Sequence, residues 1–247
     1  MLEGRTAIVT GSTGEGMGRQ IAWTLAREGA NVVLNYGTYR KSDAAAQKAV
    51  KECKALGGDA IAVRADTRKE ADVARLVAAA EKAFGDVHIA VANAGGDLIE
   101  RDLESTSLAD WKKVVDAELD GAFLLARDVL PGMRKRKDGG LVFISWDRAP
   151  LSNALPYDYA VGKAARDVLA SKLARAERKH GITVNTVAPG AIPYPTDAES
   201  KEFVRHGPRW AARTRSVNQD VAEAVLWLCR EEARFVTGSR IEVYGPN

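Results

Sequence analysis

Short apolar, β-branched segments alternate regularly along this chain with longer segments of helical periodicity, and this alternation is what most limits its possible folds. Seven short segments are predicted as strands: 6–10, 31–35, 60–64, 89–93, 141–145, 183–188 and 240–243. Longer segments are predicted as helices: 18–28, 43–56, 71–84, 108–136, 157–180 and 219–231. The strands are apolar on both faces, as expected when helices cover both sides of a sheet. The pattern predicts one α/β domain over residues 1–247, a doubly wound, seven-stranded parallel sheet with helices on both faces.

Residues 193–216 interrupt this pattern, because they are rich in Pro, Arg and Gly and show no clear periodicity. The segment is either a plain surface loop or a lid over the carboxyl ends of the strands. Ligands bind at that edge of open α/β sheets, so we favour a substrate lid.

Composition excludes several classes of protein. The chain has 36 Lys and Arg against 33 Asp and Glu, a net charge of +3, which does not define a basic face. The one cationic run, 134–137, is interpreted as a solvated helix end, so nucleic-acid binding is not expected. Cys53 and Cys229 form no disulfide framework, and the three histidines are not spaced as metal ligands. We therefore expect no metal site. No apolar run is long enough to span a membrane and no signal peptide is apparent, so we expect a cytoplasmic protein.

A glycine cluster follows the first predicted strand and leads directly into the first predicted helix. It reads Gly11-Ser12-Thr13-Gly14-Glu15-Gly16-Met17-Gly18. Glycines allow the backbone to approach a ligand closely, and the N–H groups at a helix start hold an anion. At the first strand-to-helix turn this cluster predicts a dinucleotide pyrophosphate site of the Rossmann type.

Three further motifs follow the glycine cluster in order: Asn93-Ala94-Gly95, Tyr159-x-x-x-Lys163 and Pro189-Gly190. Over essentially the whole chain this order resembles the short-chain dehydrogenase/reductase family, nearest to its branch of 3-oxoacyl-carrier-protein reductases. The spacer between Gly11 and Gly16 is one residue longer than the family pattern, so we expect a displaced bulge and retained cofactor binding.

The resemblance implies a nicotinamide dinucleotide cofactor and distributes its contacts along the chain. The pyrophosphate contacts are Gly11, Ser12, Thr13, Gly16, Met17 and Gly18; the adenosine contacts are Asn35, Tyr36, Arg40, Asp66 and Thr67; the ribose and nicotinamide contacts are Asn93, Ala94, Gly95, Tyr159, Lys163, Pro189, Gly190 and Ile192. NAD enzymes commonly carry an acidic residue after the second strand. Residues 35–41 carry no acid and two cations, so NADP(H) is favoured, although Glu15 stands where NADP-preferring relatives often have a basic residue.

Tyr159 and Lys163 are four positions apart on a predicted helix and therefore share one face. By resemblance, Tyr159 donates a proton to a carbonyl while the reduced cofactor supplies hydride, and Lys163 holds the nicotinamide ribose. A neighbouring ammonium is expected to lower the pKa of the phenol. Tyr157 is turned away from the lysine face and is assigned, with Tyr194 and Trp146, to the substrate pocket.

Two positions depart from the family pattern. Trp146 occupies the position of the serine that polarises the substrate carbonyl, and Ser145 precedes it. Adjacent strand residues face opposite sides, so either the indole replaces the hydroxyl or the loop shifts to bring Ser145 inward; we favour Ser145. Glu118 replaces the asparagine of the family's proton relay, and it either accepts hydrogen bonds from water in its place or titrates beside the lysine.

These features favour an NADP(H)-dependent oxidoreductase that interconverts a carbonyl and an alcohol on a small or medium-sized organic substrate. The alternatives are a related enzyme of different chemistry, such as imine or alkene reduction or a lyase-like step, and a weakly catalytic cofactor-binding protein. By resemblance a homo-oligomer, a tetramer or a dimer, is expected to form through the helices predicted at 108–136 and 157–180 and the C-terminal strand region.

Overall fold

Seven parallel strands form a single sheet in the order β3-β2-β1-β4-β5-β6-β7 among the residues that the structure describes. The structure is a computed structural model and describes residues 1–37, 43–96, 98–147, 156–207 and 213–244. The strands are β1 (Thr6–Val9), β2 (Asn31–Tyr36), β3 (Ala60–Arg64), β4 (Ile89–Ala92), β5 (Gly139–Ile144), β6 (Ile182–Pro189) and β7 (Arg240–Val243). The predicted α/β fold with a doubly wound, seven-stranded parallel sheet is confirmed.

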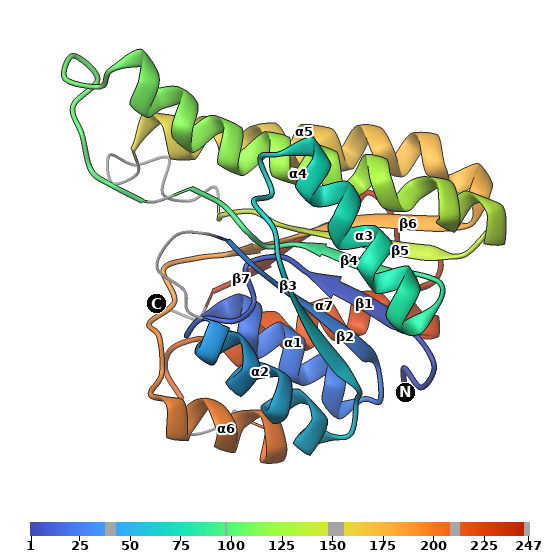
Figure 1. Ribbon diagram of the computed structural model, residues 1–247. Helices are drawn as coiled ribbons and strands as arrows, with labels where there is room; N and C mark the ends of the chain where they lie inside the picture. The colour runs from blue at the N-terminus through green and yellow to red at the C-terminus, as the bar shows by residue number, and fades with distance from the viewer. Residues whose placement is uncertain (38–42, 97, 148–155, 208–212, 245–247) are drawn as a thin grey trace.

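Helices cover both faces of the sheet (Figure 1). One layer contains α1 (Met17–Arg27), α2 (Asp43–Leu56), α6 (Asp197–His206) and α7 (Asn218–Cys229); the other contains α3 (Glu70–Phe84), α4 (Leu108–Arg136) and α5 (Tyr157–Glu177). One apolar core fills the space between the sheet and the first helix layer, and a second core fills the space between the sheet and the other layer. Strands β1, β4 and β5 are buried throughout, which explains why their sequences are apolar on both faces.

The strand order reverses between β1 and β4. β1 pairs with β2 on one side and with β4 on the other, so the chain crosses the sheet from β3 to β4. The loops that leave the carboxyl ends of β1 and β4 therefore diverge toward opposite helix layers. Such a switch point is where open α/β sheets bind their ligands.

The predicted boundaries hold for β3, β7, α2 and α4 and shift at other elements. The largest strand shift is at β5, which was expected over 141–145. Gly139 pairs with Ile182 in the ladder to β6, so the strand begins two residues earlier and ends at Ile144. Ser145 consequently lies just beyond the strand. The helix expected to end at His180 is α-helical only to Glu177, and a 3₁₀ turn completes it.

Helix α6 was not expected, because residues 193–216 show no apolar periodicity. Only Ser200 and Val204 of this ten-residue helix are buried, which leaves almost no repeating pattern to read. Its start is nevertheless encoded locally: the Thr196 hydroxyl accepts a bond from the Glu199 N–H, and the Glu199 side chain reaches back to the Thr196 N–H. This Thr-x-x-Glu capping box is the signal that would have revealed the helix.

Two side chains of the cationic run at the end of α4 form ion pairs, which a fully solvated helix end would not. Arg134 pairs with the buried Glu177 of α5, and Arg136 pairs with Asp86.

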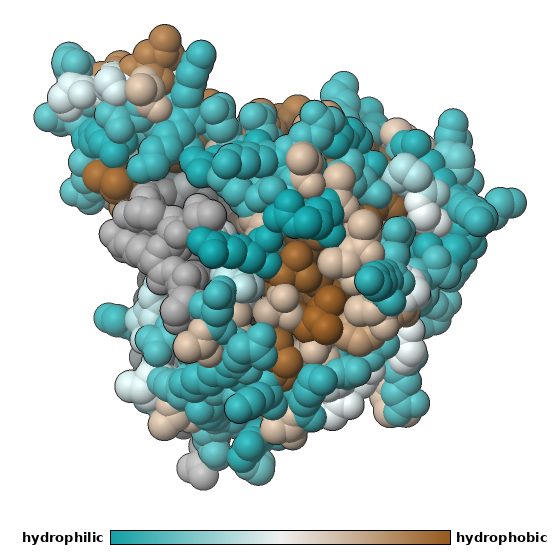
Figure 2. Space-filling model, in the orientation of Figure 1, coloured by the Kyte–Doolittle hydropathy of each residue, from teal (hydrophilic) through white to brown (hydrophobic). Residues whose placement is uncertain are grey.

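The described helices include none that is long and apolar enough to cross a bilayer. Figure 2 shows a largely hydrophilic face with an apolar area near its centre, where the edge strand β3 lies between α2 and α3.

Candidate active site

A cavity of about 750 Å³ opens at the carboxyl ends of the strands. It has the size of a small-molecule site. Many of the site residues predicted from the sequence line this cavity: Gly11, Gly16, Met17, Gly18, Asn93, Ser145, Trp146, Tyr159, Lys163, Pro189, Gly190, Ile192 and Tyr194. Leu98 also lines it, and no sequence pattern had indicated this residue. Arg215 lines it from the segment 193–216, for which a lid was proposed. The glycine loop and the Tyr-x-x-x-Lys motif therefore share one cavity.

Hydrogen bonds fasten the loops after β1 and β4 to each other. The Thr10 hydroxyl accepts bonds from the N–H groups of Asn93 and Ala94, each at 3.0 Å. In return, the Asn93 amide donates to the carbonyl oxygens of Thr10 and Gly11. Thr10 was not among the predicted site residues, although its place directly before Gly11 was visible in the sequence.

The glycine loop needs its glycines for two different reasons. Gly16 has a φ of 143°, which side chains rarely adopt, and a Cβ built there lies 3.3 Å from the Tyr194 ring. At Gly18 a Cβ would lie only 2.4 Å from the Asn93 side chain and from the Gly11 carbonyl oxygen. Within this loop the Thr13 hydroxyl is buried and has no hydrogen-bond partner in the described structure.

Several predicted cofactor contacts are engaged elsewhere. The Ser12 hydroxyl donates to the Val9 carbonyl. The Asn35 side chain accepts from the Gly11 N–H and donates to the Ala65 carbonyl, so it supports the loop from below.

The predicted adenosine residues are also paired within the chain. The Tyr36 hydroxyl donates to Asp43 at 2.8 Å. Arg68 makes a two-pronged ion pair with Asp66, which holds the pKa of that carboxyl below its usual value. Thr67 packs beside Gly121 of α4. Arg40 lies outside the described residues.

Tyr157 does not line the cavity. Its side chain is 54% exposed at the first turn of α5. Tyr194 is exposed as well, but its ring covers Gly16 at the cavity wall.

Tyr159 and Lys163 lie on one face of α5, as their spacing predicts. The Lys163 ammonium is 5.1 Å from the centre of the Tyr159 ring. It also donates to the Ile144 carbonyl at 3.3 Å and lies 3.0 Å from Oε2 of Glu118.

The expected lowering of the Tyr159 pKa is not found. Burial raises the pKa of the phenol, and the Glu118 carboxylate raises it further, against the lowering effect of Arg166. Burial also lowers the pKa of Lys163 to about 8, although Glu118 opposes this change. The sequence argument allowed for Glu118 beside the lysine but considered only the effect of the ammonium on the phenol, and neither the carboxylate's effect nor burial.

Ser145 and Trp146 both line the cavity, because the chain leaves its strand before they occur. The Ser145 hydroxyl is buried and donates to the Lys163 carbonyl at 3.2 Å. The Trp146 ring meets the Tyr159 ring edge-on, with centres 6.0 Å apart, and its buried Nε1–H has no partner among the described residues. Two candidate donors therefore line the same cavity as the Tyr159 phenol.

Glu118 lies beneath the cavity, fully buried in α4. One carboxylate oxygen accepts from the Gly96 N–H, and the other contacts both Lys163 and Arg166. Sequence reasoning missed Arg166. Its position three residues after Lys163 places it on the same side of the helix, but this spacing alone does not indicate a buried role.

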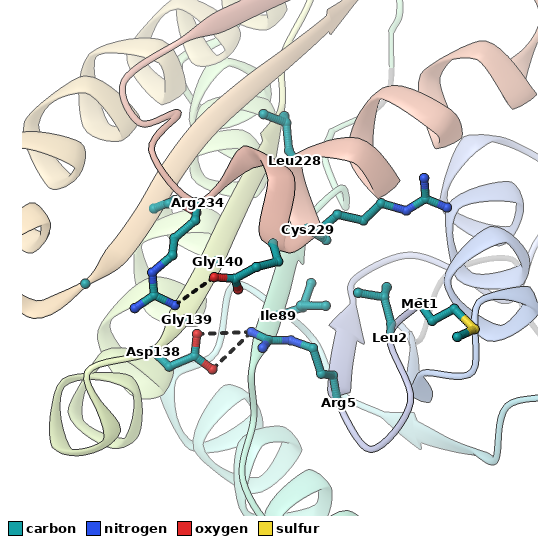
Figure 3. A pocket seen from close by; sticks show the side chains of 14 residues that line it. Met1, Leu2, Arg5, Ile89, Asp138, Gly139, Gly140, Leu228, Cys229 and Arg234 are labelled. Atoms are coloured by element: carbon teal, nitrogen blue, oxygen red, sulfur yellow. Dashed lines mark hydrogen bonds and ion pairs between the residues drawn. The ribbon is translucent and has the colours of Figure 1, made fainter.

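A second, smaller cavity of about 230 Å³ lies at the opposite, amino-terminal edge of the sheet (Figure 3). Arg5 pairs with Asp138 across it, and Arg234 pairs with Glu231. None of the predicted site residues lines this cavity. Over the described ranges no group of three or more His, Cys, Asp or Glu side chains is placed to hold a metal ion.

Comparison with known proteins agrees with this geometry. Residues 11–245 match the family described as enoyl-(acyl carrier protein) reductase. The chain is 34% identical to 3beta-hydroxysteroid dehydrogenase 1 of Eggerthella lenta, over 99% of this chain and 94% of the relative. It is 33% identical to the 3-oxoacyl-(acyl-carrier-protein) reductase FabG of Staphylococcus aureus, over 98% and 97% of the two chains.

A solved structure gives the same result. The crystal structure of a dehydrogenase/reductase from Sinorhizobium meliloti superposes with a TM-score of 0.83 at 31% identity, covering 98% of this chain and 94% of that one. The glycine loop, the Tyr-x-x-x-Lys motif and these full-length similarities lead to one conclusion: this chain belongs to the short-chain dehydrogenase/reductase family of NAD(P)-dependent enzymes.

Proposed function

We propose that the protein interconverts a carbonyl and an alcohol on a small or medium-sized organic substrate, with NADP(H) as its cofactor. The observation that carries this proposal is the single cavity lined by the glycine loop, Tyr159 and Lys163. The relatives named above act, by their names, on a hydroxysteroid and on a 3-oxoacyl carrier protein, and a third, at 32% identity, is glucose 1-dehydrogenase 2 of Bacillus subtilis. These substrates share a carbonyl or hydroxyl carbon as the reacting centre and little else.

The residues around the glycine loop fit a dinucleotide. Gly11 and Gly16 both have positive φ and present backbone without a side chain at the cavity wall. The buried Thr13 hydroxyl, unpartnered in the described structure, is a donor that a pyrophosphate oxygen would satisfy. The first turn of α1 offers its free N–H groups to the same anion. The bound cofactor would supply or accept a hydride at the substrate carbon.

Tyr159 is the proposed proton donor in the reduction. Burial and Glu118 raise the pKa of its phenol, so the hydroxyl is protonated at neutral pH and available to a carbonyl oxygen. Lys163 is proposed to hold the nicotinamide ribose, and its low pKa of about 8 leaves it mostly charged at pH 7. Ser145 is proposed to donate the second hydrogen bond to the carbonyl oxygen, with the Trp146 indole as the alternative donor.

A substrate panel tests the proposed activity. Cyclic ketones, 3-oxoacyl thioesters and aldoses represent the chemistry of the three relatives, and NADPH oxidation or NADP⁺ reduction is followed at each. We expect turnover of at least one class. Tight NADPH binding with no turnover of any class would contradict an oxidoreductase and support a cofactor-binding protein.

The preference for NADP(H) rests on the end of β2, where Asn35, Tyr36 and Gly37 carry no acidic side chain. We expect NADPH to bind more tightly than NADH and Arg40→Ala to reduce this preference by roughly 10- to 100-fold, which corresponds to a charge-assisted hydrogen bond of about 1.5–3 kcal/mol. Fluorescence titration with NADPH and with NADH measures this preference. Lys51→Ala, on the exposed side of α2, is the control. Tighter NADH binding, unchanged by Arg40→Ala, would reverse the assignment.

We also propose a homo-oligomer that forms through α4 and α5. Phe123 of α4 and Val168 of α5 expose large apolar surfaces, at 47% and 61% of their areas, on the two longest helices. We expect a dimeric or tetrameric mass by light scattering at micromolar concentration, and a smaller species for Val168→Glu, because a carboxylate is costly to bury at an apolar contact. Lys51→Glu on α2 should keep the wild-type mass. A monomeric wild-type protein would contradict the proposal.

A further inference from the structure

Three charged side chains lie buried together beneath the proposed catalytic tyrosine. Glu118 of α4 and Arg166 of α5 are each 0% exposed, and Lys163 of α5 is 6% exposed. The second carboxylate oxygen of Glu118 is 3.0 Å from Nζ of Lys163 and 3.1 Å from Nη2 of Arg166. One carboxylate therefore serves two cations, and the cluster carries a net charge of +1.

The backbone is shaped around this carboxylate. A Cβ at Gly95 would lie 2.2 Å from Oε1 of Glu118, and one at Gly162 would lie 2.7 Å from the Glu118 Cβ. The N–H of Gly96 donates to the same oxygen at 2.9 Å. The glycines thus let Glu118 lie directly against the backbone, where the Gly96 N–H holds one of its oxygens.

Arg166 is fixed at least as firmly. Its Nη1 donates to the carbonyl oxygens of Ala92 and Ile144, at 3.1 and 2.9 Å, which end β4 and β5. Its Nη2 donates to Ala94 and its Nε to the backbone carbonyl of Glu118. A guanidinium is charged at every accessible pH and presents its donors in a rigid fork. It is therefore a permanent partner for the carboxylate.

Lys163 is held far more loosely. Beyond Glu118 its ammonium has one hydrogen-bond acceptor in the described structure, the Ile144 carbonyl at 3.3 Å, and it lines the open cavity. If Lys163 were the only cation near Glu118, each movement of its ammonium toward a ligand would leave a buried carboxylate without a counter-ion. Such an unpaired buried charge is strongly destabilising.

We propose that Arg166 is a positioning residue that acts as the permanent counter-ion of Glu118, so that the carboxylate can hold the Lys163 ammonium beside Tyr159 and also release it to a ligand. This inference rests on the proposed function for the roles of Tyr159 and Lys163, and on the described contacts for the pairing itself. Arg166 need not touch the substrate or the cofactor to act in this way.

The pairing also sets the charge that Tyr159 experiences. The groups that face its phenol are Glu118 from α4, Arg166 and Lys163 from α5, and Tyr194 from the segment after β6. Glu118 and Tyr194 raise the pKa of the phenol, and Arg166 lowers it. Neutralising Glu118 should therefore shift phenolate formation to lower pH. Neutralising Arg166 should shift it to higher pH.

A double-mutant cycle tests the proposal with Glu118→Gln, Arg166→Met and the variant that carries both. The matched control is the other Glu–Arg pair between α4 and α5, Glu177→Gln with Arg134→Met, which lies at the far end of these helices. The readouts are denaturant unfolding, phenol absorbance with Tyr159→Phe as the blank, NADPH binding, and the pH profile of alcohol oxidation.

We expect each single change in the cluster to lower the folding equilibrium constant by about 100-fold or more, and the double change to recover most of the loss, because removal of a whole buried pair is far milder than removal of one partner. Arg166→Met should also weaken NADPH binding, since Lys163 is then the only cation near Glu118. Its pH profile should move to higher pH and that of Glu118→Gln to lower pH. Arg166→Lys, which keeps the charge, should restore the profile in part.

The proposal is overturned if the losses in the cycle are additive, or if Arg166→Met changes stability but leaves the pH profile and NADPH affinity as they are in Arg134→Met. Should Glu118→Gln not fold, the comparison of Arg166→Met with the double variant still decides. Failure of the proposed function has a different signature: no carbonyl substrate is turned over by the wild type, while the unfolding cycle and the phenol titration still report whether the pair is coupled.

Discussion

Tyr159→Phe is expected to lower kcat for carbonyl reduction by roughly 10²- to 10⁴-fold, the contribution of a positioned general acid. Only the hydroxyl is removed. The phenyl ring keeps the edge contact with Trp146 and the approach of the Lys163 ammonium. Steady-state kinetics with NADPH and the best substrate of the panel measure the loss.

NADPH affinity provides the control for this variant, because the ring remains in the cavity wall and the glycine loop is untouched. Affinity should stay near the wild-type value while turnover is lost. If Tyr159→Phe keeps wild-type turnover, the proton comes from another group and the assignment of Tyr159 is wrong.

The second large effect concerns the hydrogen bond to the substrate oxygen. Ser145→Ala removes a hydroxyl and Trp146→Phe removes an indole N–H while keeping an aromatic ring. One of the two is expected to lower kcat by about 10²- to 10³-fold, as loss of one oxyanion donor does. We expect the larger loss for Ser145→Ala, because a hydroxyl that donates to the Lys163 carbonyl at 3.2 Å can rotate toward the cavity.

The two variants separate the alternatives because the side chains use different donors. A large loss for Trp146→Phe with normal Ser145→Ala kinetics would assign the unpartnered indole Nε1–H to the substrate oxygen. Wild-type kinetics in both variants would mean that Tyr159 alone contacts that oxygen. Thermal unfolding of each variant checks that the end of β5 stays intact.

The fold and the cavity could be predicted from the sequence because their signals are local. Apolar strands, helical periods and a glycine cluster at the first strand-to-helix turn are each readable over about ten residues. Helix α6 was missed since its periodicity is almost absent, and its capping box at Thr196 and Glu199 was not read.

A position of Glu118 beside Lys163 was one of the alternatives predicted, but the full charged cluster could not be predicted, since it depends on which side chains three distant segments bring together. Nothing in the order of residues states that Arg166 reaches the carbonyl ends of β4 and β5, or that it shares the Glu118 carboxylate with Lys163. The raised pKa of Tyr159 follows from burial of the phenol and from the nearby Glu118 carboxylate. Sequence spacing places neighbours on one helix, and only the fold adds the neighbours from another.

The bonds between Thr10 and Asn93 link positions 83 residues apart. Those from Arg166 to Ala92 and Ile144 span 74 and 22 residues. A nascent chain that ends before α5 therefore has the pyrophosphate loop without the guanidinium that joins the strand ends behind it. Closing such long loops costs entropy before any contact repays it, which slows folding. Cofactor-binding competence should consequently arise late and all at once, when α5 docks onto the sheet, and not stepwise as each motif leaves the ribosome.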